Sequence, residues 1–491
     1  MGLEMTGSRV LAIHFGSSIY VWGAIIGVFL AALSIGYYSG GMLADRRPSF
    51  YPLNALLLVA GGWLMLIPFY ANPVCRLLLR FNPGERLGPL LATLILFGGP
   101  SVLLGMVSPY AVRLAAQTVE RIGNVSGSLY ALSTFGSIAG TLLVAFWLVP
   151  ALGVRALLQI LGLCLLVLPL VVVPWSRRKA VLAAGVALFA SLLFLVSYVR
   201  NVPAQGVIYE GDSAYHYVKV ADDRQRNIRF LQFNNYVEGA IDLNPPYDTR
   251  VSYTNAFQLA RIFKTNLKNI LIIGGGGGIG ARKFVGEDPK VTVDLVEIDQ
   301  RVVDLGLQYF HLEPGERLRI HVEDGRSFIR RTQTKYDLVI LDAFTIGGQI
   351  PFHLTTREFF DEIKQTLAPD GLVLANINGT LRGRRSRIMR AEYKTLATVF
   401  DNVYLFPHLH ETERAPGGVL DQDRPRSIIV VALNGARWTK ESVVAMAAQL
   451  VNVAQTPTFL QDANQFFDSQ LPTGDVPLLT DDYAPVDTMV F

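Results

Sequence analysis

The chain has 491 residues, of which 51% are hydrophobic and 17% charged, and its mean hydropathy is +0.34. This length predicts two or more domains rather than one compact core, and the hydropathy is too high for an ordinary soluble enzyme. The two cysteines, Cys75 and Cys164, lie in or beside apolar segments, which excludes a disulfide framework and a zinc site.

Charge is divided unevenly along the sequence. Residues 1–200 carry 13 Lys and Arg against 4 Asp and Glu, whereas residues 201–491 carry 31 against 36, so the two parts have formal charges of +9 and −5. This asymmetry is typical of a membrane half with basic flanks followed by a soluble, mildly acidic half. The isoelectric point near 8.9 comes from the membrane half and gives no argument for nucleic-acid binding.

Six apolar stretches are long enough to cross a bilayer as helices, which takes about 20 residues each. They lie near residues 19–40, 52–71, 88–107, 127–149, 154–174 and 180–199. Their centres hold essentially no ionisable side chain, which a proton- or ion-coupled transporter usually needs, so residues 1–200 are interpreted as an anchor or lid. Glycine pairs spaced by four residues predict close helix–helix approach. They are Gly23/Gly27, Gly36/Gly40 and Gly136/Gly140.

Residues 1–18 are too short and polar for a further span. Counting Lys and Arg in the links gives seven on one side and six on the other, which does not decide the orientation. We expect a multi-pass protein of the cell inner membrane with its soluble domain in the cytosol, because the nucleoside ligand inferred below is made there.

From Pro203 the sequence is soluble in character. Short strands are predicted within 207–220 and 227–233, which makes residues 201–250 a small cap of β-hairpins. A helix over 251–264 then opens the main soluble domain, residues 251–491.

The stretch Asn269–Glu297 has the pattern of a nucleotide-binding βαβ unit. An apolar strand, 270–273, enters a run of glycines, Gly274 to Gly278, and a helix and a second strand, 291–296, follow before Glu297. Glycines let the backbone turn tightly and approach a ligand, and an acid that ends the second strand can accept hydrogen bonds from ribose hydroxyls. The sequence therefore predicts a nucleoside site.

Further strands are predicted at 318–322, 336–341 and 372–375, with a helix near 355–367. Strands that alternate with helices favour a doubly wound parallel sheet, whose ligands bind beyond the carboxyl ends of the strands. Glu297, Asp324 and Asp342 all fall at such ends, so we expect them to share one site.

In this order, the motifs resemble the polyamine aminopropyltransferases (the spermidine synthase family), and specifically the bacterial subfamily fused to membrane helices. The resemblance covers about residues 212–380. It rests on IIGGGGG at 272–278, LVEID at 295–299, EDG at 323–325, YDLVILDAF at 336–344 and LTTREFF at 354–360, with SSIYVW at 17–22 and GGMLADRRP at 40–48 in the membrane half. Relatives usually have a further apolar helix upstream, whose end Met1–Arg9 resembles, so we expect the natural chain to begin earlier.

The resemblance implies an α-helical transmembrane bundle followed by an α/β doubly wound, Rossmann-like domain of the AdoMet-methyltransferase type with a small β cap. The implied substrate is S-adenosylmethionine (AdoMet) or its decarboxylated form, whose propyl-bearing chain is attacked by an amine while methylthioadenosine leaves. Ligand binding is implied for Gly274, Gly275, Gly276, Gly278, Glu297 (ribose hydroxyls) and Asp324 (the adenine amino group). Asp342 is implied as the base or cation holder.

Three aromatic positions also match family segments. Tyr215 matches the tyrosine of the Ser-Pro-Tyr-Gln segment and Tyr253 that of the gate segment, so both are candidate catalytic residues, although core aromatics explain them equally well. His216 stands where the family has glutamine and is a candidate ligand-binding residue.

The sequence departs from the family at acids that normally counter ammonium groups. Gly277 replaces the acid of the glycine turn, Thr345 the second acid of Asp-Ser-Ser-Asp, and Arg250 stands where relatives tend to be acidic. Because a buried ammonium without its partner is costly, the departures suggest that intact AdoMet binds, its carboxylate drawn to Arg250. An AdoMet lyase that forms homoserine lactone and methylthioadenosine is then an alternative.

Two further alternatives are a methyltransferase, less favoured because the acid that often precedes the first glycine is missing, and a transporter or sensor with a nucleoside-binding domain. We expect no metal and no nucleic-acid partner, since a wide basic face with interleaved aromatics is missing. Expected partners are the small-molecule substrate, membrane lipids and a second copy in a homodimer.

Three further features of the soluble half allow a structural or a functional interpretation. His353, in a loop, is more often structural than functional. A basic run after the last predicted strand predicts a solvated loop or a contact with anionic lipid headgroups. It comprises Arg382, Arg384, Arg385, Arg387 and Arg390. The tail Leu479–Pro485 is expected to pack over the site, with Asp482 a remote candidate for a lost acceptor acid.

Overall fold

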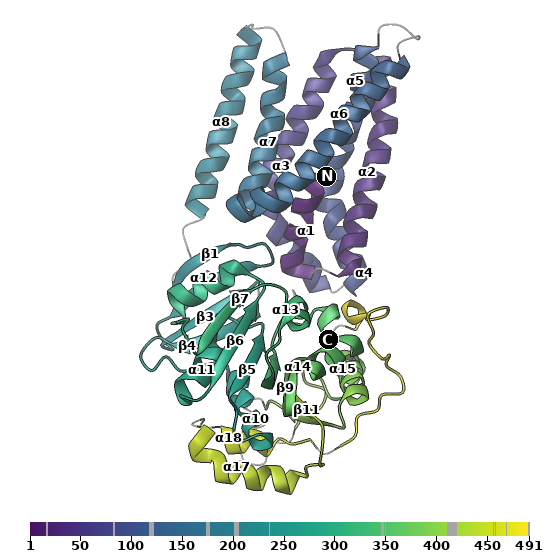
Figure 1. The fold of residues 1–491 in the computed structure, drawn as a ribbon. Helices are drawn as coiled ribbons and strands as arrows, with labels where there is room; N and C mark the ends of the chain where they lie inside the picture. Colours follow the sequence, from purple (N-terminus) through teal and green to yellow (C-terminus); the bar gives the residue numbers. More distant parts are fainter. Residues whose placement is uncertain are drawn as a thin grey trace. The chain divides into compact units, whose positions relative to one another are not determined.

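The computed structural model describes residues 1–491 apart from a set of short segments, and it divides the chain into two compact units. The segments outside the described residues are 16–17, 82–83, 117–121, 173–176, 201–205, 235, 345–347, 349, 410–419, 455, 457, 468 and 490–491. The N-terminal unit comprises Met1–Gln205 and Glu210–Tyr217, and the C-terminal unit comprises Gly206–Tyr209 and Val218–Phe491 (Figure 1).

The N-terminal unit is helical, as its composition predicts. Its helices are α1 (Gly2–Phe15), α2 (Ile19–Arg46), α3 (Phe50–Phe81), α4 (Gly84–Thr93), α5 (Gly99–Ala115), α6 (Ile122–Leu143), α7 (Val149–Val172) and α8 (Arg177–Arg200). Two π-helical turns, η1 (Leu94–Gly98) and η3 (Val144–Leu148), join α4 to α5 and α6 to α7.

Among the described residues, five helical segments are long and apolar enough to cross a membrane: Ile19–Arg46, Phe50–Phe81, Arg86–Ala115, Ile122–Leu148 and Ala151–Val171. They contain the first three expected stretches and overlap most of the fourth and fifth, 127–149 and 154–174. The sixth, near 180–199, falls in α8, whose described apolar stretch is Gly185–Phe194, so it stays a prediction as a span.

The predicted close helix approach occurs at one glycine pair. A Cβ atom added to Gly36 would lie 2.4 Å from the Val102 carbonyl oxygen, and one added to Gly40 would lie 2.6 Å from Met106, so α2 and α5 touch backbone to backbone. The other two pairs, Gly23/Gly27 and Gly136/Gly140, have no atom within 4 Å of an added Cβ among the described residues. Their spacing allows a close approach that the described residues do not show.

The expected β cap is a four-stranded sheet in the order β1-β2-β3-β4. Its strands are β1 (Val207–Asp212), β2 (Tyr217–Asp223), β3 (Ile228–Phe233) and β4 (Tyr236–Asp242). Alternate side chains such as Val218 and Leu231 form an apolar cluster with Ile279 and Val302. The cap is thereby packed on the helices that follow the glycine turn and the second core strand.

The main sheet has seven strands in the order β10-β11-β9-β8-β5-β6-β7. They are β5 (Asn269–Ile273), β6 (Thr292–Glu297), β7 (Leu318–Val322), β8 (Tyr336–Leu341), β9 (Leu367–Gly379), β10 (Asn402–Pro407) and β11 (Arg426–Leu433). The five predicted strands are β5 to β9, and they pair in parallel.

Two findings correct the predicted sheet. β11 is antiparallel to both β9 and β10, so the sheet is mixed. β9 begins at Leu367, before the Pro-Asp-Gly sequence expected to separate helix and strand. The overall class, a Rossmann-like α/β domain of the methyltransferase type after a helical membrane-like region, is confirmed.

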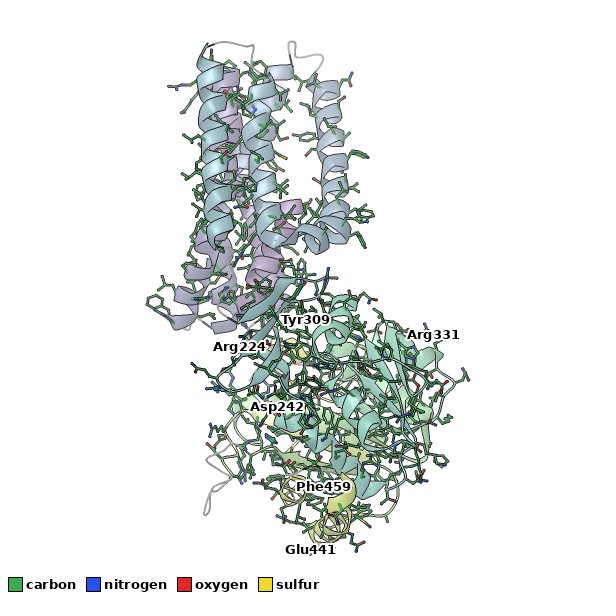
Figure 2. The ribbon with its side chains drawn as sticks, turned by 90° about the vertical axis from the view of Figure 1, so that its left-hand side faces the viewer. Arg224, Asp242, Tyr309, Arg331, Glu441 and Phe459 are labelled. Atoms are coloured by element: carbon green, nitrogen blue, oxygen red, sulfur yellow. The ribbon has the colours of Figure 1, made fainter. Side chains whose placement is uncertain are left out.

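Helices cover both faces of this sheet (Figure 1). They are α9 (Ser252–Ala256), α10 (Ala260–Phe263), α11 (Ile279–Glu287), α12 (Gln300–Tyr309), α13 (Gly325–Arg331), α14 (Arg357–Thr366), α15 (Arg387–Val399), α17 (Lys440–Ala454) and α18 (Phe459–Ala463). Because side chains alternate across a strand, Ile270 and Ile272 pack in one cluster with α11, α17 and α18. Leu271 and Ile273 pack in another with α13, α14 and α15. Figure 2 draws the side chains, with Asp242 of β4 and Tyr309 of α12 labelled.

Candidate active site

The glycine turn between β5 and α11 is held between two other chain segments. Gly274 has φ 77°, and a Cβ there would lie 2.6 Å from the backbone oxygen of Asp342. Gly276 has φ 49°, and a Cβ there would lie 2.7 Å from the Glu238 carbonyl oxygen. Side chains rarely adopt these angles and would collide, so glycine is required for the turn to pass between the end of β8 and strand β4.

Glu297 ends β6 with its carboxyl group beside this turn. The backbone N–H of Asp299 donates to Oε1 over 3.1 Å, and the N–H groups of Gly275 and Ile298 also bond the carboxylate. Glu297 is 9% exposed, and burial raises its pKa to about 7 despite these donors. A buried carboxylate that backbone donors hold in place is a suitable acceptor for ligand hydroxyls.

Asp342 directly follows β8. Its Oδ1 accepts a hydrogen bond from Asn376 Nδ2, on β9, over 2.9 Å. Burial raises the pKa of Asp342 well above its ordinary value, and the charges of Glu238 and Glu297 raise it further. Asn376 is 1% exposed, and its Oδ1 has no hydrogen-bond partner among the described residues, which leaves a buried acceptor beside the carboxyl group.

Glu238, on β4, was not identified from the sequence. Burial, followed by the charge of Glu297, raises its pKa to about 7. The Tyr253 hydroxyl, from α9, donates to the Glu238 carbonyl oxygen over 2.9 Å. Burial raises the pKa of Tyr253 well above its ordinary value, and Asp342 and Glu238 add to the effect. Glu238, Tyr253, Glu297 and Asp342 therefore form one electrostatically coupled group, which we call the acid cluster.

A sequence signal for Glu238 existed. It is a single acid between Val237 and Gly239 in the apolar run that follows the predicted strand 227–233. In the structure a Cβ added to Gly239 would lie 2.6 Å from the Gly276 carbonyl oxygen. This approach of β4 to the glycine turn brings the acid to the site.

Asp324 is engaged differently. It caps α13, because its Oδ1 accepts a hydrogen bond from the Ser327 N–H over 2.9 Å, while its Oδ2 lies 2.9 Å from His353 Nε2. Burial acts to raise the pKa of Asp324, but the Ser327 and His353 contacts outweigh it, so the pKa is lowered. Asp324 therefore keeps its negative charge at neutral pH, with His353 as its partner.

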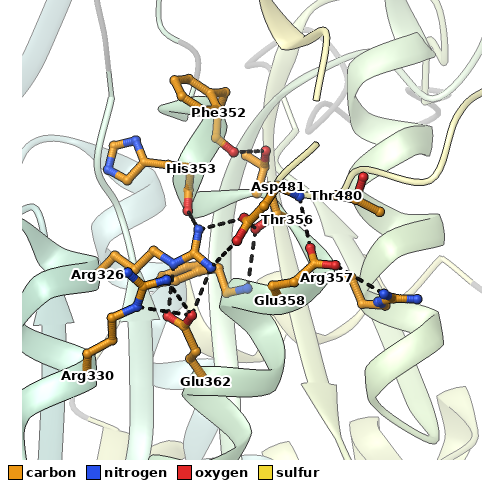
Figure 3. A network of polar contacts seen from close by, with 12 residues as sticks. Arg326, Arg330, Phe352, His353, Thr356, Arg357, Glu358, Glu362, Thr480 and Asp481 are labelled. Carbon is orange, nitrogen blue, oxygen red and sulfur yellow. Dashed lines mark hydrogen bonds and ion pairs between the residues drawn. The ribbon is translucent and has the colours of Figure 1, made fainter. Parts of the chain in front are cut away.

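The C-terminal tail is tied to α13 and α14 through Arg326 (Figure 3). Arg326 donates to both carboxylate oxygens of Glu362 and of Asp481, and also to the His353 carbonyl oxygen over 3.2 Å. The tail residue in this network is Asp481, and not its neighbour Asp482, the sequence candidate. The role of Asp482 as a substitute acceptor acid stays a prediction.

Tyr215 and His216 lie in the turn between β1 and β2. Their backbone N–H groups donate to Ser213 Oγ over 3.1 and 2.8 Å. Burial, with the charge of Arg9 adding to it, lowers the pKa of His216 to about 4. Both residues belong to the N-terminal unit and the acid cluster to the C-terminal unit, so their assignment to the site stays a prediction from resemblance.

The three departures from the family pattern have different outcomes. Gly277 has φ 83° in the glycine turn. Thr345 lies outside the described residues. The Arg250 guanidinium lies 2.6 Å from an Asp242 carboxylate oxygen, which already supplies it with an anionic partner.

Within the described part of the chain, no group of three or more His, Cys, Asp or Glu is arranged to hold a metal ion.

Comparisons with known proteins match both parts of the chain. The family model described as the spermine/spermidine synthase domain matches residues 255–407. A polyamine aminopropyltransferase of Vibrio vulnificus (strain CMCP6) is 33% identical over 227 residues, which cover 45% of this chain and 74% of the relative. Polyamine aminopropyltransferase 2 of Aquifex aeolicus (strain VF5) is 23% identical over 383 residues, 75% of this chain and 74% of the relative. This second match is longer than the C-terminal unit and so extends into the N-terminal unit. The crystal structure of a probable spermidine synthase from Corynebacterium glutamicum ATCC 13032 has a TM-score of 0.43 and 22% identity, covering 56% of this chain and 100% of that chain.

Proposed function

Because the chain belongs to the spermine/spermidine synthase family, whose members are transferase enzymes, we propose that it transfers an aminopropyl group from decarboxylated AdoMet to an amine and releases methylthioadenosine. The acid cluster carries this proposal. Three carboxyl groups, from β4, from the end of β6 and from the residue after β8, act on one another and on one tyrosine hydroxyl. Two of them lie at the carboxyl ends of parallel strands, where α/β sheets bind ligands.

The electrostatics of the cluster favour a cationic ligand. Each of Glu238, Glu297 and Asp342 has a raised pKa, because burial and neighbouring negative charges disfavour ionisation. A sulfonium or ammonium group placed among them would return the carboxyl groups to their charged form and offset the repulsion. Decarboxylated AdoMet and a diamine together supply one sulfonium and several ammonium groups. An ammonium would also supply the donor that the buried Asn376 Oδ1 lacks.

Intact AdoMet fits this cluster less well than its decarboxylated form. Its extra carboxylate would add a fourth negative group near Glu238 and Asp342. Arg250, the side chain expected from the sequence to attract that carboxylate, is paired with Asp242. We therefore favour the decarboxylated nucleoside.

The homoserine-lactone alternative rested on missing acceptor acids. Glu238 supplies an acid that the sequence argument did not count. Nothing in the described part of the chain favours a lyase over a transferase, so the lyase is kept only as an outcome of the experiment below.

The residues take the following roles in the proposal. Glu297 accepts hydrogen bonds from the ribose hydroxyls, and the remaining lone pairs of Asp324 accept from the adenine amino group. The amine nitrogen attacks the carbon attached to sulfur, the carbon–sulfur bond breaks, and its electron pair stays on the sulfur of methylthioadenosine. Asp342 takes the proton that the amine releases, and Tyr253 lies beside it. Gly274, Gly275, Gly276 and Gly278 give the nucleoside close access to the backbone.

The test uses the full-length chain purified in a non-ionic detergent. It is incubated with decarboxylated AdoMet or intact AdoMet, each with and without putrescine, and the products are identified by mass spectrometry. We expect methylthioadenosine and an aminopropylated amine in equal amounts, only when decarboxylated AdoMet and the amine are both present. Methylthioadenosine from intact AdoMet without amine would select the lyase, and a methylated product would select a methyltransferase. If neither nucleoside is consumed with any diamine, the proposal is wrong.

We further propose that the five long apolar helices anchor the enzyme in the cell inner membrane, in contact with lipids, with the C-terminal unit in the cytosol. The C-terminal unit should resist added protease in intact spheroplasts and be digested in inverted membrane vesicles; the opposite pattern contradicts the orientation. We also propose a homodimer, because relatives of the soluble domain commonly dimerise. The mass of the purified protein in detergent checks this.

A further inference from the structure

The C-terminal unit has a cavity whose lining does not include the acid cluster. The cavity has a volume of about 560 Å³. Its walls come from the segment that joins β9 to α15, from the first turn of α15, from Gln422 before β11 and from the segment that follows α18. The lining residues used below are Arg382, Arg384, Arg387, Arg390, Gln422 and Asp475. The volume is that of a small-molecule site.

The charge of this cavity is strongly positive. Its described lining contains four arginines and one acid, Asp475. Arg390 is 7% exposed and fixed in place, because Nη2 bonds Asp475 over 2.9 Å and Nε bonds Ser386 Oγ over 2.9 Å. Asp475 is therefore paired with the buried Arg390, and the positive charge of the other three arginines is not compensated by an acid of the lining.

Two of those arginines have nothing to bind. Arg382 and Arg384 are exposed, and their side chains make no hydrogen bond or ion pair with any residue that the structure describes. Arg387 is half-buried and acts on Asp475 from the first turn of α15. Three guanidinium groups thus line a cavity without a carboxylate of their own.

The walls around these arginines are held by backbone bonds. The N–H groups of Leu381 and Arg382 both donate to the Gln422 carbonyl oxygen, over 2.9 and 3.1 Å. On the other side, Arg390 Nη1 donates to the Pro472 carbonyl oxygen over 2.7 Å, and Lys394 Nζ donates to that of Thr473 over 3.1 Å. The segment that carries the arginines is therefore held against the facing wall, whereas the sequence predicted a solvated loop or a contact for anionic headgroups.

We propose that this cavity binds a phosphate-bearing ligand with at least two negative charges. A guanidinium group matches the geometry of phosphate oxygens and can bond two of them at once. Such a ligand would compensate Arg382, Arg384 and Arg387, and the N-terminus of α15 adds favourable partial charge. The same phosphate chemistry is offered by the headgroup of an anionic phospholipid and by a soluble phosphate compound, and the experiment separates these sources.

The experiment measures binding by calorimetry on the full-length chain in a non-ionic detergent. One arm uses inorganic pyrophosphate, and the other uses dihexanoyl phosphatidic acid, with dihexanoyl phosphatidylcholine as its zwitterionic control. The variant is Arg382→Gln/Arg384→Gln. Its matched control is Arg385→Gln, because Arg385 is exposed in the same run but does not line the cavity.

We expect binding to the unaltered chain, weakened at least about tenfold in the double variant and changed less than about twofold in Arg385→Gln. Binding should also weaken as salt is added. Pyrophosphate binding assigns a soluble ligand, and binding of phosphatidic acid alone assigns a lipid headgroup. The proposal is overturned if neither phosphate compound binds, if phosphatidylcholine binds as well as phosphatidic acid, or if Arg385→Gln weakens binding as much as the double variant. None of these readouts depends on turnover.

Discussion

Arg326 and Asp481 are joined by two parallel hydrogen bonds, Nη1 to Oδ1 and Nη2 to Oδ2, both 2.7 Å long (Figure 3). They are 155 residues apart in the sequence. Arg326 is 6% exposed and belongs to α13, the helix that Asp324 caps. It also donates to the carbonyl oxygen of His353, whose ring contacts Asp324. The tail is therefore connected, through one guanidinium group, to a candidate nucleoside-binding carboxylate.

This connection predicts different effects for two adjacent tail acids. Asp481→Asn leaves the buried Arg326 with Glu362 as its one carboxylate partner among the described residues, and should destabilise the C-terminal unit by about 1–3 kcal/mol. Asp482→Asn should change stability by less than about 0.5 kcal/mol. Thermal unfolding of the two variants in detergent measures this difference, and methylthioadenosine affinity should fall only in Asp481→Asn. Equal behaviour of the two variants would show that the Arg326 contact has no such role.

Asp342→Asn tests the proposed base. The amide cannot accept the proton of the attacking amine, so kcat should fall by about 10²–10⁴-fold. Methylthioadenosine carries no ammonium group, so its affinity for the variant should stay within about threefold of the original. Steady-state kinetics and calorimetry separate the two effects. A kcat close to that of the unaltered enzyme would remove Asp342 from the chemistry.

The raised pKa values of Glu238 and Glu297, both about 7 instead of 4.5, predict a pH dependence of stability. A carboxyl group with a raised pKa in the folded state stabilises the fold below its unfolded pKa and loses that contribution as pH rises through the folded value. The unliganded enzyme should therefore lose stability between about pH 4.5 and 7. Glu238→Gln, which cannot ionise, should show a smaller loss, and unfolding midpoints across this range measure it.

The same carboxyl groups predict that cationic ligands bind better at higher pH. Decarboxylated AdoMet should gain about tenfold or more in affinity between pH 5 and pH 8, relative to methylthioadenosine, which has the same adenosine but no positive charge. In Glu238→Gln the relative gain should be smaller. A ratio of the two dissociation constants that does not change with pH would contradict the proposed role of the acid cluster.

Two glycines, one in the glycine turn and one in α11, give a matched pair of substitutions. Gly274→Ala combines φ 77° with a Cβ 2.6 Å from the Asp342 carbonyl oxygen, so nucleoside affinity should fall at least about tenfold. Gly286→Ala, in α11, meets no atom within 4 Å and should stabilise the protein by about 0.4–1 kcal/mol. Calorimetry with methylthioadenosine and thermal unfolding report the two effects. If Gly274→Ala binds the nucleoside normally, the turn does not approach the ligand as proposed.

Local pattern was enough to predict much of the C-terminal unit. The five strands β5 to β9 and the turn at Gly274 follow from apolar runs and glycines that lie close together in the sequence. Strands β10 and β11 were not predicted. β11 pairs antiparallel with β9 although it is the last strand in the chain, and β10 pairs with the other side of β11. The basic run predicted a solvated side chain for Arg390, but in the structure its guanidinium group is buried against Asp475.

By itself, the sequence determined that the chain has an apolar helical half and an α/β half, and that Glu297 and Asp342 lie at the carboxyl ends of parallel strands, because strand ends and helix spans are set by the periodicity of nearby residues. Only the tertiary structure decided that Glu238 joins them and that Asp481, not Asp482, holds Arg326. The first contact depends on β4 packing against the glycine turn, and the second on which tail carboxylate reaches the buried Arg326. Both join segments far apart in the sequence, so no short stretch of residues predicts them.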